Sequence, residues 1–309
     1  MQHFTTRRKF LKTGATAMAV AATCFSFTYK KKMPLLSFST LGCPDWDYNT
    51  ILNFAAENNY QGIELRGIQR ELDLSKCDAF KTDENIQNSL ALAEEKNLKF
   101  VDLGSSAEMH HAGEATRQKN LDGAKQFIAL AEKLKCPYIR VFPNQLPKDQ
   151  DKNFTLDTIT KNLIELGEYA KNTNVSVLME THGDLTQSDD ILKIMQSAAG
   201  AHVGLVWDIV NMWSITKESP ALVYEKLKKY IHHTHIKDAN IIDGKDNYVL
   251  LGKGQTPIFQ AIDLLYKNNF PGFYSFEWEK LWHPEIEDSK IALADYPVAI
   301  KNHFAQKLN

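Results

Sequence analysis

The stretch 175-VSVLMETHGD-184 carries an apolar run straight into a glutamate and a histidine. A buried parallel strand has this kind of continuous Val, Leu and Met run, because helices cover both faces of its sheet. Glu180 and His182 are two residues apart at the end of the run, so their side chains face the same side of the sheet. The stretch therefore predicts a buried strand that ends in functional side chains.

Three later segments repeat this pattern of an apolar run that meets a metal-binding residue type. They are 203-VGLVWD-208, 232-HHTHIKD-238 and 272-GFYSFEWE-279, which contain Asp208, His235 and Glu277. Each of these residues alone is explained equally well as a polar cap of a strand or helix. Together with Glu180 they form one set of three carboxylates and an imidazole, so we predict that all four meet at one metal site.

Strand and helix patterns alternate along the rest of the chain. Short apolar runs predict strands, and longer segments with helical spacing and start signals predict helices. The predicted strands are 35–40, 62–66, 99–104, 138–142, 176–180, 203–208, 231–237 and 273–278. The predicted helices are 48–58, 85–96, 114–134, 155–172, 188–197, 220–230, 257–268 and one within 286–307.

This alternation predicts an α/β fold of a particular kind. Eight strands, each followed by a helix, imply a parallel sheet that closes into a (β/α)8 TIM barrel, with residues 31–309 as a single domain. An open, doubly wound sheet is the alternative, but the sequence has neither the GxGxxG nor the GxxxxGKS/T motif typical of such sheets. The irregular segment 239–255 is long for a connection, and we expect it to fold over the site as a loop or hairpin.

The first thirty residues differ from the rest of the chain. The motif 5-TTRRKFLK-12 is a twin-arginine export signature, and an uncharged run over 13–29 follows it. This run is shorter than the roughly 20 residues usual for a bilayer span. We therefore predict that residues 1–30 are a cleaved signal peptide, that the mature protein is periplasmic and that no stable membrane span remains. A membrane anchor or a lipoprotein attached through Cys24 is the alternative.

Composition excludes several classes of protein. With 43% hydrophobic and 24% charged residues in 309, the chain is neither disordered nor a multi-span membrane protein. Removing residues 1–22 leaves 32 basic and 38 acidic residues. The chain thus lacks the excess of basic residues that proteins use to bind the nucleic-acid backbone, and we expect no nucleic-acid partner. The remaining cysteines, Cys43, Cys77 and Cys136, are isolated and odd in number, so we expect small buried side chains rather than a disulfide framework.

The predicted ligands also limit the metal and its chemistry. Barrel enzymes place catalytic groups at the carboxyl ends of their strands, which is where these four residues fall. A mostly oxygen ligand set suits Mn²⁺ first, with Mg²⁺, Co²⁺ or Zn²⁺ as alternatives. Such a cation can stabilise the enediolate that forms when a carbon next to a carbonyl loses its proton, and two carboxylates flanking a sugar could remove and return that proton.

Several of these motifs together resemble a known family. They are Glu180, Asp208 with Asn211 in DIVN, His235 in THIKD, Glu277 in GFYSFEWE, 60-YQGIELRG-67 and 251-LGKG-254. Over about residues 34–305 the chain resembles the xylose isomerase-like TIM barrels of the sugar phosphate isomerase/epimerase group, in the superfamily of the family 2 AP endonucleases. The resemblance implies that Glu180, Asp208, His235 and Glu277 bind one divalent metal, that Glu180 and Glu277 are the catalytic acid/base pair, and that His182 and Lys237 line the substrate pocket.

Further substrate-binding candidates have competing structural explanations. Asn211 stands where AP endonucleases of the family carry an extra metal-binding histidine, which argues against a DNA substrate. His110, like His111, could face the substrate or solvent. Glu64 could reach the pocket or pair with Arg66 on the same predicted strand. A barrel-interior salt bridge is the default for Arg140, and Trp46, Trp207, Trp278 and Trp282 could stack on a sugar or pack in the core.

Together these patterns predict a divalent-metal-dependent sugar isomerase or epimerase that abstracts a proton next to a carbonyl. The first alternative is a 3-keto-glycoside lyase, which would use the same site for β-elimination and which an exported location favours. The second is a non-catalytic, exported carbohydrate-binding barrel. The expected partner is a small sugar or keto-sugar, with no nucleic acid, and a homo-oligomer is compatible with the sequence.

Overall fold

A computed structural model describes residues 32–198, 200 and 202–307 of the protein. The residues from Pro34 onward form one compact unit. The signal peptide predicted for residues 1–30 lies outside the described residues and stays a prediction. Among the described helices, none combines the length and the apolar composition that a membrane crossing needs. Cys43, Cys77 and Cys136 are free and buried, as expected.

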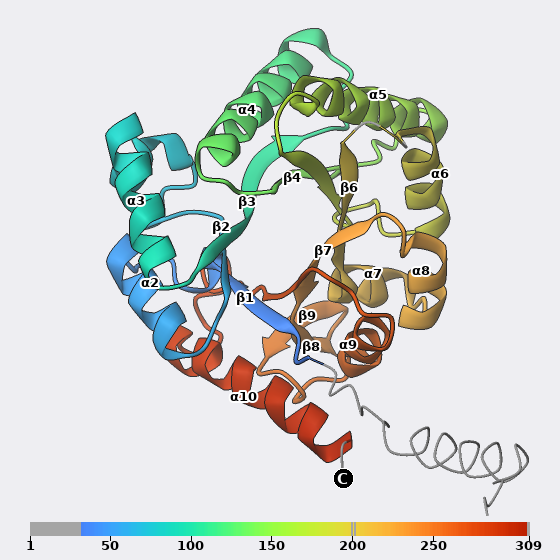
Figure 1. The fold of residues 1–309 in the computed structure, drawn as a ribbon. Coiled ribbons are helices and arrows are strands. Elements are labelled where there is room, and N and C mark those ends of the chain that lie inside the picture. The colour runs from blue at the N-terminus through green and yellow to red at the C-terminus, as the bar shows by residue number, and fades with distance from the viewer. Residues whose placement is uncertain (1–31, 199, 201, 308–309) are drawn as a thin grey trace, which may run out of the picture. The chain divides into compact units, whose positions relative to one another are not determined.

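Eight parallel strands close into a barrel, which confirms the predicted TIM barrel. Figure 1 shows them as a ring, with helices along its outside. Around the ring the order is β1, β10, β7, β6, β5, β4, β3 and β2. The strands are β1 (Leu35–Ser39), β2 (Gly62–Leu65), β3 (Lys99–Glu108), β4 (Tyr138–Phe142), β5 (Ser176–Glu180), β6 (Val203–Asp208), β7 (Ile231–Ile236) and β10 (Phe273–Phe276).

The strand register brings the four predicted ligands to one end of the barrel. Glu180 is the last residue of β5, and Asp208 is the last residue of β6. Asp208 is level with His235 on β7, and Glu277 directly follows β10. Because parallel strands point the same way, these residues share the carboxyl edge, where barrel enzymes carry their active sites.

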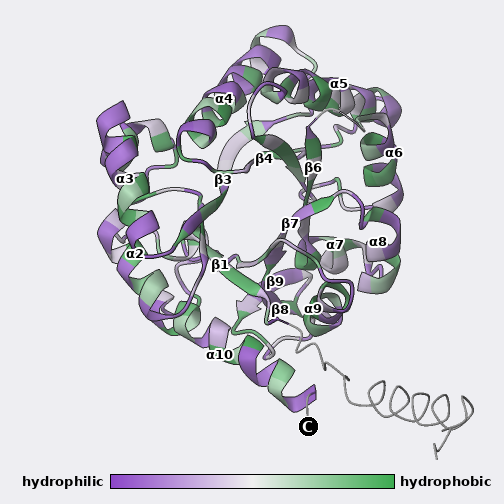
Figure 2. Cartoon of the chain, viewed as in Figure 1, coloured by the Kyte–Doolittle hydropathy of each residue, from purple (hydrophilic) through white to green (hydrophobic). Residues whose placement is uncertain are grey.

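The outer helices bury one apolar face each against the barrel. In α9 (Ile258–Lys267) the buried residues Ile258, Ala261, Ile262 and Leu265 recur at helical spacing. Figure 2 shows apolar residues along β1, β4 and β6 and mostly polar residues along α3. The other helices of the ring are α2 (Tyr48–Glu57), α3 (Asp83–Glu95), α4 (Glu114–Lys133), α5 (Lys152–Ala170), α6 (Ser188–Ala198), α8 (Pro220–Leu227) and α10 (Ser289–Lys307), with short 3-10 helices at Thr40–Gly42, Leu74–Lys76 and Asp78–Phe80.

Helix α7 (Ile209–Thr216) is not predicted by the sequence patterns. Its sequence is rich in β-branched and aromatic residues, which have low helix propensity. The structure explains the helix by its cap, because Asp208 Oδ1 accepts a hydrogen bond from the Asn211 backbone N–H at 2.9 Å. One aspartate therefore ends a strand and begins a helix.

The irregular segment after β7 folds as an antiparallel hairpin of β8 (Asp238–Ile242) and β9 (Lys245–Val249). Asp238 holds the turn that follows, because its Oδ2 accepts hydrogen bonds from the N–H groups of Gly252 and Gly254 at 2.9 and 3.0 Å. A Cβ at Gly254 would lie 2.1 Å from Asp238 Oδ1, so only glycine fits there. The hairpin and the GKG motif are thus one packed unit beside the barrel mouth.

Candidate metal centre

The four predicted ligands form one compact, buried group. Each offers a ligand atom, and these atoms all lie within 4.8 Å of one another. Nδ1 of His235 is 3.3 Å from Glu277 Oε1, 3.4 Å from Glu180 Oε1 and 3.8 Å from Asp208 Oδ2. Three carboxylates therefore converge on one imidazole nitrogen, an arrangement that four strand ends create from distant parts of the chain.

The ligand atoms of this group fit a divalent cation. Among the described residues, His235 Nδ1 is buried without a hydrogen-bond partner, whereas Glu180 Oε2 and Asp208 Oδ2 form no hydrogen bond but lie 3.1 Å from Arg140 Nε and 2.8 Å from Lys237 Nζ. A buried polar atom without a partner is costly, and a cation would satisfy His235 Nδ1 while it binds the carboxylate oxygens beside it. Oxygen ligands with one imidazole suit Mn²⁺, Mg²⁺ or Zn²⁺. The donor set fits the predicted metal, and the identity of that metal stays a prediction.

The two predicted acid/base residues titrate differently. Burial raises the pKa of Glu277 to about 7, against the opposing charges of His235 and Lys237. Burial also raises the pKa of Glu180, but the positive charges of Arg140 and His235 outweigh it and bring that pKa well below its ordinary value. Before a metal binds, one carboxylate of the pair is thus ionised at neutral pH while the other retains much of its proton. Such a pair is suited to acid/base work.

Metal affinity should rise with pH, because a cation must displace the proton on His235. Burial lowers the pKa of His235, but Glu277 and Glu64 raise it well above its ordinary value. Each displaced proton makes the apparent association constant rise about tenfold per pH unit. Since Glu277 also holds a proton below about pH 7, the slope should steepen there. Mn²⁺ titrations of wild type and Glu277→Gln would measure both effects, and an affinity independent of pH would contradict the site.

Glu64 lies inside the barrel, behind the metal group, by which we mean Glu180, Asp208, His235 and Glu277. Its Oε2 contacts Nε2 of His233 at 2.9 Å and Nε2 of His235 at 3.1 Å, and it accepts a hydrogen bond from Ser275 Oγ at 3.1 Å. The side chain is fully buried, so the structure places it on His235 rather than among the residues that line the pocket. A carboxylate at Nε2 holds the proton on that nitrogen and leaves Nδ1 free to bind a metal.

The substitution Glu64→Gln should lower metal affinity about 10- to 100-fold, because a neutral amide accepts the imidazole proton more weakly than a carboxylate does. A competition titration with a metal indicator measures this effect without any assay of turnover. Glu94→Gln, at an exposed glutamate that pairs with Lys135 on the surface, is a matched control. An unchanged dissociation constant in Glu64→Gln would show that Glu64 does not orient His235.

A pocket of about 210 Å³ opens over the metal group. Lys237 is buried on its wall, with Nζ 2.8 Å from Asp208 Oδ2 and 2.7 Å from Glu277 Oε2. His182 also lines it, and the ring nitrogen Nδ1 lies 2.9 Å from Asn144 Oδ1. The lining residues are Leu41, Arg66, Arg140, Phe142, Glu180, His182, Lys237, Glu277, Glu279 and Trp282.

Gly183 fixes the turn that carries His182. Its φ is +63°, and a Cβ there would lie 2.3 Å from the carbonyl oxygen of Asn144. Asp184 donates its backbone N–H to the same carbonyl at 2.8 Å. The loops after β4 and β5 are thus locked together, which places the His182 ring against Phe142 with centroids 4.6 Å apart.

Two other predicted substrate contacts lie away from this lining. The backbone N–H of Asn211 donates to the capping side chain of Asp208, as described, and Asn211 is half-buried. The rings of His110 and His111 are in contact, tilted by 38° with centroids 3.9 Å apart. With Glu108 these two histidines form a separate group whose ligand atoms lie within 4.8 Å of one another. Their roles in substrate binding stay predictions.

Some pocket residues were predicted to have other roles or were missed. Arg140 forms the expected interior ion pair, with Nε 3.1 Å from Glu180 Oε2. Trp207 and Trp278 are buried core residues, whereas Trp282 is 52% exposed and lines the pocket. Glu279 was missed, although the alternation in Glu277-Trp278-Glu279 indicates that both glutamates face the same side.

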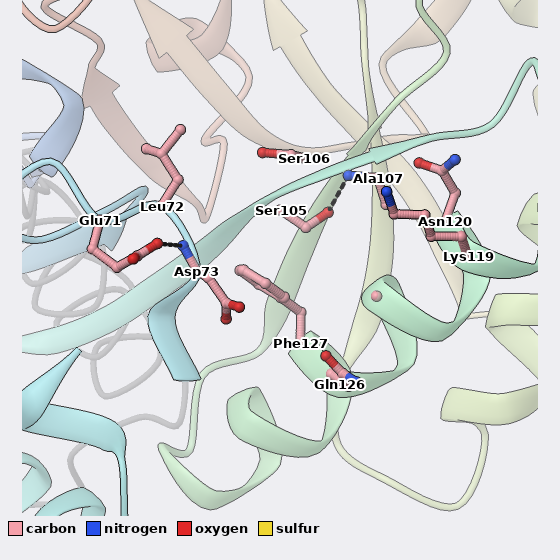
Figure 3. Close-up of a pocket in the computed structure, with 11 residues that line it drawn as sticks. Glu71, Leu72, Asp73, Ser105, Ser106, Ala107, Lys119, Asn120, Gln126 and Phe127 are labelled. Carbon is pink, nitrogen blue, oxygen red and sulfur yellow. Dashed lines mark hydrogen bonds between the residues drawn. The ribbon is translucent and has the colours of Figure 1, made fainter. Parts of the chain in front are cut away.

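Larger cavities lie elsewhere on the barrel. One of about 410 Å³ is lined by Ser105 and Ser106 of β3 and by Phe127 of α4, among others (Figure 3). Another, of about 610 Å³, is lined by Phe100 and Phe273 among others. Neither is lined by any of the four predicted metal ligands. The chemistry of the side chains, rather than cavity size, therefore identifies the site.

Comparison with known families agrees with this geometry. The family model described as Xylose isomerase-like TIM barrel matches residues 52–295. The chain belongs to the xylose isomerase-like TIM barrel family. The resemblance predicted from the four-ligand set is confirmed at the level of the family.

Relatives in the xylose isomerase-like family are enzymes. The chain is 22% identical over 227 residues to 3-dehydroshikimate dehydratase of Bacillus anthracis, covering 70% of this chain and 78% of that protein. It is also 22% identical over 236 residues to fructoselysine 3-epimerase of Shigella flexneri, covering 72% of this chain and 82% of that protein. Dehydration and epimerisation thus both occur among relatives of this barrel.

Solved structures of the same fold include epimerases and a magnesium complex. The 3-keto-D-glucoside 4-epimerase YcjR of E. coli superposes with a TM-score of 0.68 at 14% identity, covering 89% of this chain and all of that one. A xylose isomerase-like TIM barrel protein from Mycobacterium smegmatis in complex with magnesium superposes with a TM-score of 0.65 at 17% identity, covering 90% and 98% of the two chains. At these identities the comparison shows the fold alone.

Proposed function

We propose that this protein is a divalent-metal-dependent sugar isomerase or epimerase, which abstracts a proton next to the carbonyl of a sugar or keto-sugar. The observation that carries the proposal is the convergence of Glu180, Asp208 and Glu277 on Nδ1 of His235 beneath a small pocket. Epimerases among the relatives and in the same fold support it. Mn²⁺ is our first choice of metal, and Mg²⁺ is supported by the magnesium complex of a structural neighbour.

Each side chain has a role in this reaction. A bound cation would draw charge from the carbonyl oxygen and so make the neighbouring C–H bond acidic. Glu180, ionised in the metal-free site, accepts the proton from carbon. Glu277, whose pKa is raised, returns a proton on the other side of the substrate. Lys237 Nζ contacts Asp208, Glu277 and Glu279, so it holds these carboxylates in place and balances their charge.

Elimination by a 3-keto-glycoside lyase is the second candidate. It begins with the same proton abstraction and then loses a group from the next carbon. A dehydratase among the relatives and a 3-keto-glucoside epimerase of the same fold favour it. Trp282, exposed at the rim of the pocket, offers a surface for the group that leaves.

A non-catalytic carbohydrate-binding barrel is the alternative from another class. Such a protein needs hydrogen bonds to hydroxyl groups, but it gains nothing from burying four titratable ligands around one point. The enzyme relatives also disfavour it.

For the intact chain we further propose export by the twin-arginine route to the periplasm. A fusion of residues 1–30 to a reporter would test this proposal, with a fusion in which both arginines are replaced by lysine as the control.

Deuterium exchange tests the chemical step that the isomerase and the lyase share, whichever product forms. The full-length protein with Mn²⁺ is incubated in D2O with a panel of ketoses and 3-keto-glycosides. We expect deuterium at the carbon next to the carbonyl of at least one sugar, together with an epimer or a released aglycone. Epimer formation identifies the isomerase and aglycone release the lyase. Sugar binding without any exchange would favour the carbohydrate-binding barrel.

A further inference from the structure

Arg66 is a buried cation on the wall of the pocket. It follows β2, its side chain lines the pocket above the metal group, and the residue is 5% exposed. Its Nη2 donates to Ser106 Oγ at 2.9 Å, and its Nη1 approaches the Gly104 carbonyl oxygen at 3.4 Å. Both partners are neutral, so they orient the guanidinium without balancing its charge.

The other cations of the pocket have carboxylate partners, and Arg66 does not. Arg140 lies against Glu180, and Lys237 contacts Asp208, Glu277 and Glu279. Within the described part of the chain, no carboxylate lies within ion-pair distance of Arg66. Burial and the neighbouring charge of Arg140 lower the pKa of Arg66 to about 9, which still leaves it charged at neutral pH. An unpaired buried charge destabilises a protein unless something balances it.

The backbone is built to hold two guanidinium groups side by side. A Cβ at Gly104 of β3 would lie 2.7 Å from Arg66 Cδ and 3.0 Å from Arg140 Nη2, so a glycine leaves the space that both arginines fill. Like charges this near repel each other, and among the described carboxylates Glu180 alone lies within ion-pair distance of either guanidinium, where it contacts Arg140. Glu180, Glu277 and Glu64 act on Arg66 from farther away. The β2–β3–β4 side of the pocket therefore holds a guanidinium that no described carboxylate contacts.

We propose that Arg66 binds an anionic group of the substrate, a carboxylate or a phosphate, and thereby makes the enzyme selective for acidic sugars over neutral ones. The inference rests on the proposed function, because it assigns the substrate class of that site. The planar guanidinium matches both anions with two parallel hydrogen bonds. A neutral sugar would leave the charge unpaired, so the site discriminates against it.

The pocket allows one small molecule to contact Arg66 and the acid/base pair at the same time. Arg66, Glu180 and Glu277 line the same cavity of about 210 Å³. A sugar acid can thus place its anion at Arg66 while its carbonyl region lies at the acid/base pair. A purely structural arginine would be expected to balance a carboxylate of the barrel, as Arg140 does.

The test compares three six-carbon polyols on the full-length, Mn²⁺-loaded protein by calorimetry. D-Glucitol is neutral, D-gluconate adds a carboxylate and D-glucitol 6-phosphate adds a phosphate, so the two anions distinguish the two sources of charge. We expect wild type to bind one of the anions about 10- to 100-fold more tightly than glucitol. Arg66→Met should reduce this ratio to about one, while glucitol affinity changes by less than about threefold. Arg70→Met, at an exposed arginine paired with Asp45, should keep the wild-type ratio.

Several outcomes would overturn the inference. No preference in wild type would overturn it, and so would a preference that Arg66→Met retains, because the anion would then bind the metal or Lys237. Arg66→Met should unfold no more easily than wild type, since it removes an unpaired charge. A large fall in its melting temperature with an unchanged binding ratio assigns a structural role. If the methionine variant does not fold, Arg66→Lys is measured in its place. Lysine keeps the positive charge but lacks the paired N–H donors of the guanidinium, so this variant should retain part of the preference for the anion.

This design separates the inference from the proposed function. If anions and glucitol bind equally well and deuterium exchanges into a neutral sugar, the anion site is wrong but the proposed enzyme activity stands. If the preference for an anion depends on Arg66 but no deuterium exchanges into any sugar acid or neutral sugar, the enzyme activity is wrong but the anion site stands.

Discussion

Glu180→Gln is expected to lower kcat by about three orders of magnitude while KM changes by less than about threefold. The amide keeps the shape of the carboxylate and an oxygen that can face a cation, but it cannot accept a proton from carbon. Glu180 is the carboxylate best suited to that task, because Arg140 and His235 overcome the effect of burial and lower its pKa. Initial rates with a substrate from the sugar panel measure both constants.

Metal content and surface charge need separate controls in this experiment. Glu180→Gln must retain its metal, which elemental analysis shows, so that a lost base is not confused with a lost ligand. Glu94→Gln, on the surface of α3, should leave kcat unchanged. If Glu180→Gln retains more than about a tenth of the wild-type kcat, another group removes the proton. If it binds sugar normally and wild type shows no turnover, the protein is a binding barrel.

The barrel could be predicted because its strands are apolar runs that end in polar residues. In VGLVWD and VSVLME the run is continuous, which indicates burial on both faces, and the structure confirms both strands with their predicted bounds. Helix α7 was missed because its β-branched sequence argues for a strand. What forms it is the side chain of Asp208, whose Oδ1 caps the helix.

The members of the metal group could be predicted, but the roles of their neighbours could not. Residue type and position at a strand end suffice to bring Glu180, Asp208, His235 and Glu277 together on a closed barrel. Alternation along β2 places Glu64 and Arg66 on the same side of the strand without naming their partners. The partner of Glu64 is His235, which lies 171 residues away, across the barrel interior.

The partners of Arg66 could not be predicted from the sequence either. Its proximity in sequence to Glu64 favours an ion pair between the two, but Glu64 is already held by two histidines and a serine. Only the closed barrel shows that Arg66 has neutral partners and faces the pocket. Pairings across a barrel depend on which strands are neighbours, which no local pattern contains.

Removal of the metal is expected to abolish turnover and to destabilise the barrel. In the metal-free site burial raises the pKa values of Glu180 and Asp208, but the positive charges of Arg140, His235 and Lys237 outweigh it and already lower them, so the effect expected of a cation is that of a ligand which binds the folded state. A cation that binds only the folded state should raise the free energy of unfolding by about 4 kcal/mol at a thousandfold excess over its dissociation constant. Denaturant titrations at increasing Mn²⁺ concentration measure this linkage, and kcat should return with the same concentration dependence.

The variant Asp208→Ala connects the stability effect to these four ligands. It removes Oδ2, which lies 3.8 Å from His235 Nδ1 and 2.8 Å from Lys237 Nζ, and it also removes the helix cap. Its metal-free form should therefore already be less stable, by about 1 kcal/mol for the cap and by about 3 kcal/mol for the broken buried ion pair. Its unfolding midpoint should then respond little to Mn²⁺, because a ligand is missing. If wild type shows no shift with Mn²⁺, Mg²⁺, Co²⁺ or Zn²⁺, the converging carboxylates do not hold a cation. If wild type and Asp208→Ala shift equally, the cation binds elsewhere, and the Glu108, His110 and His111 group is the next place to examine.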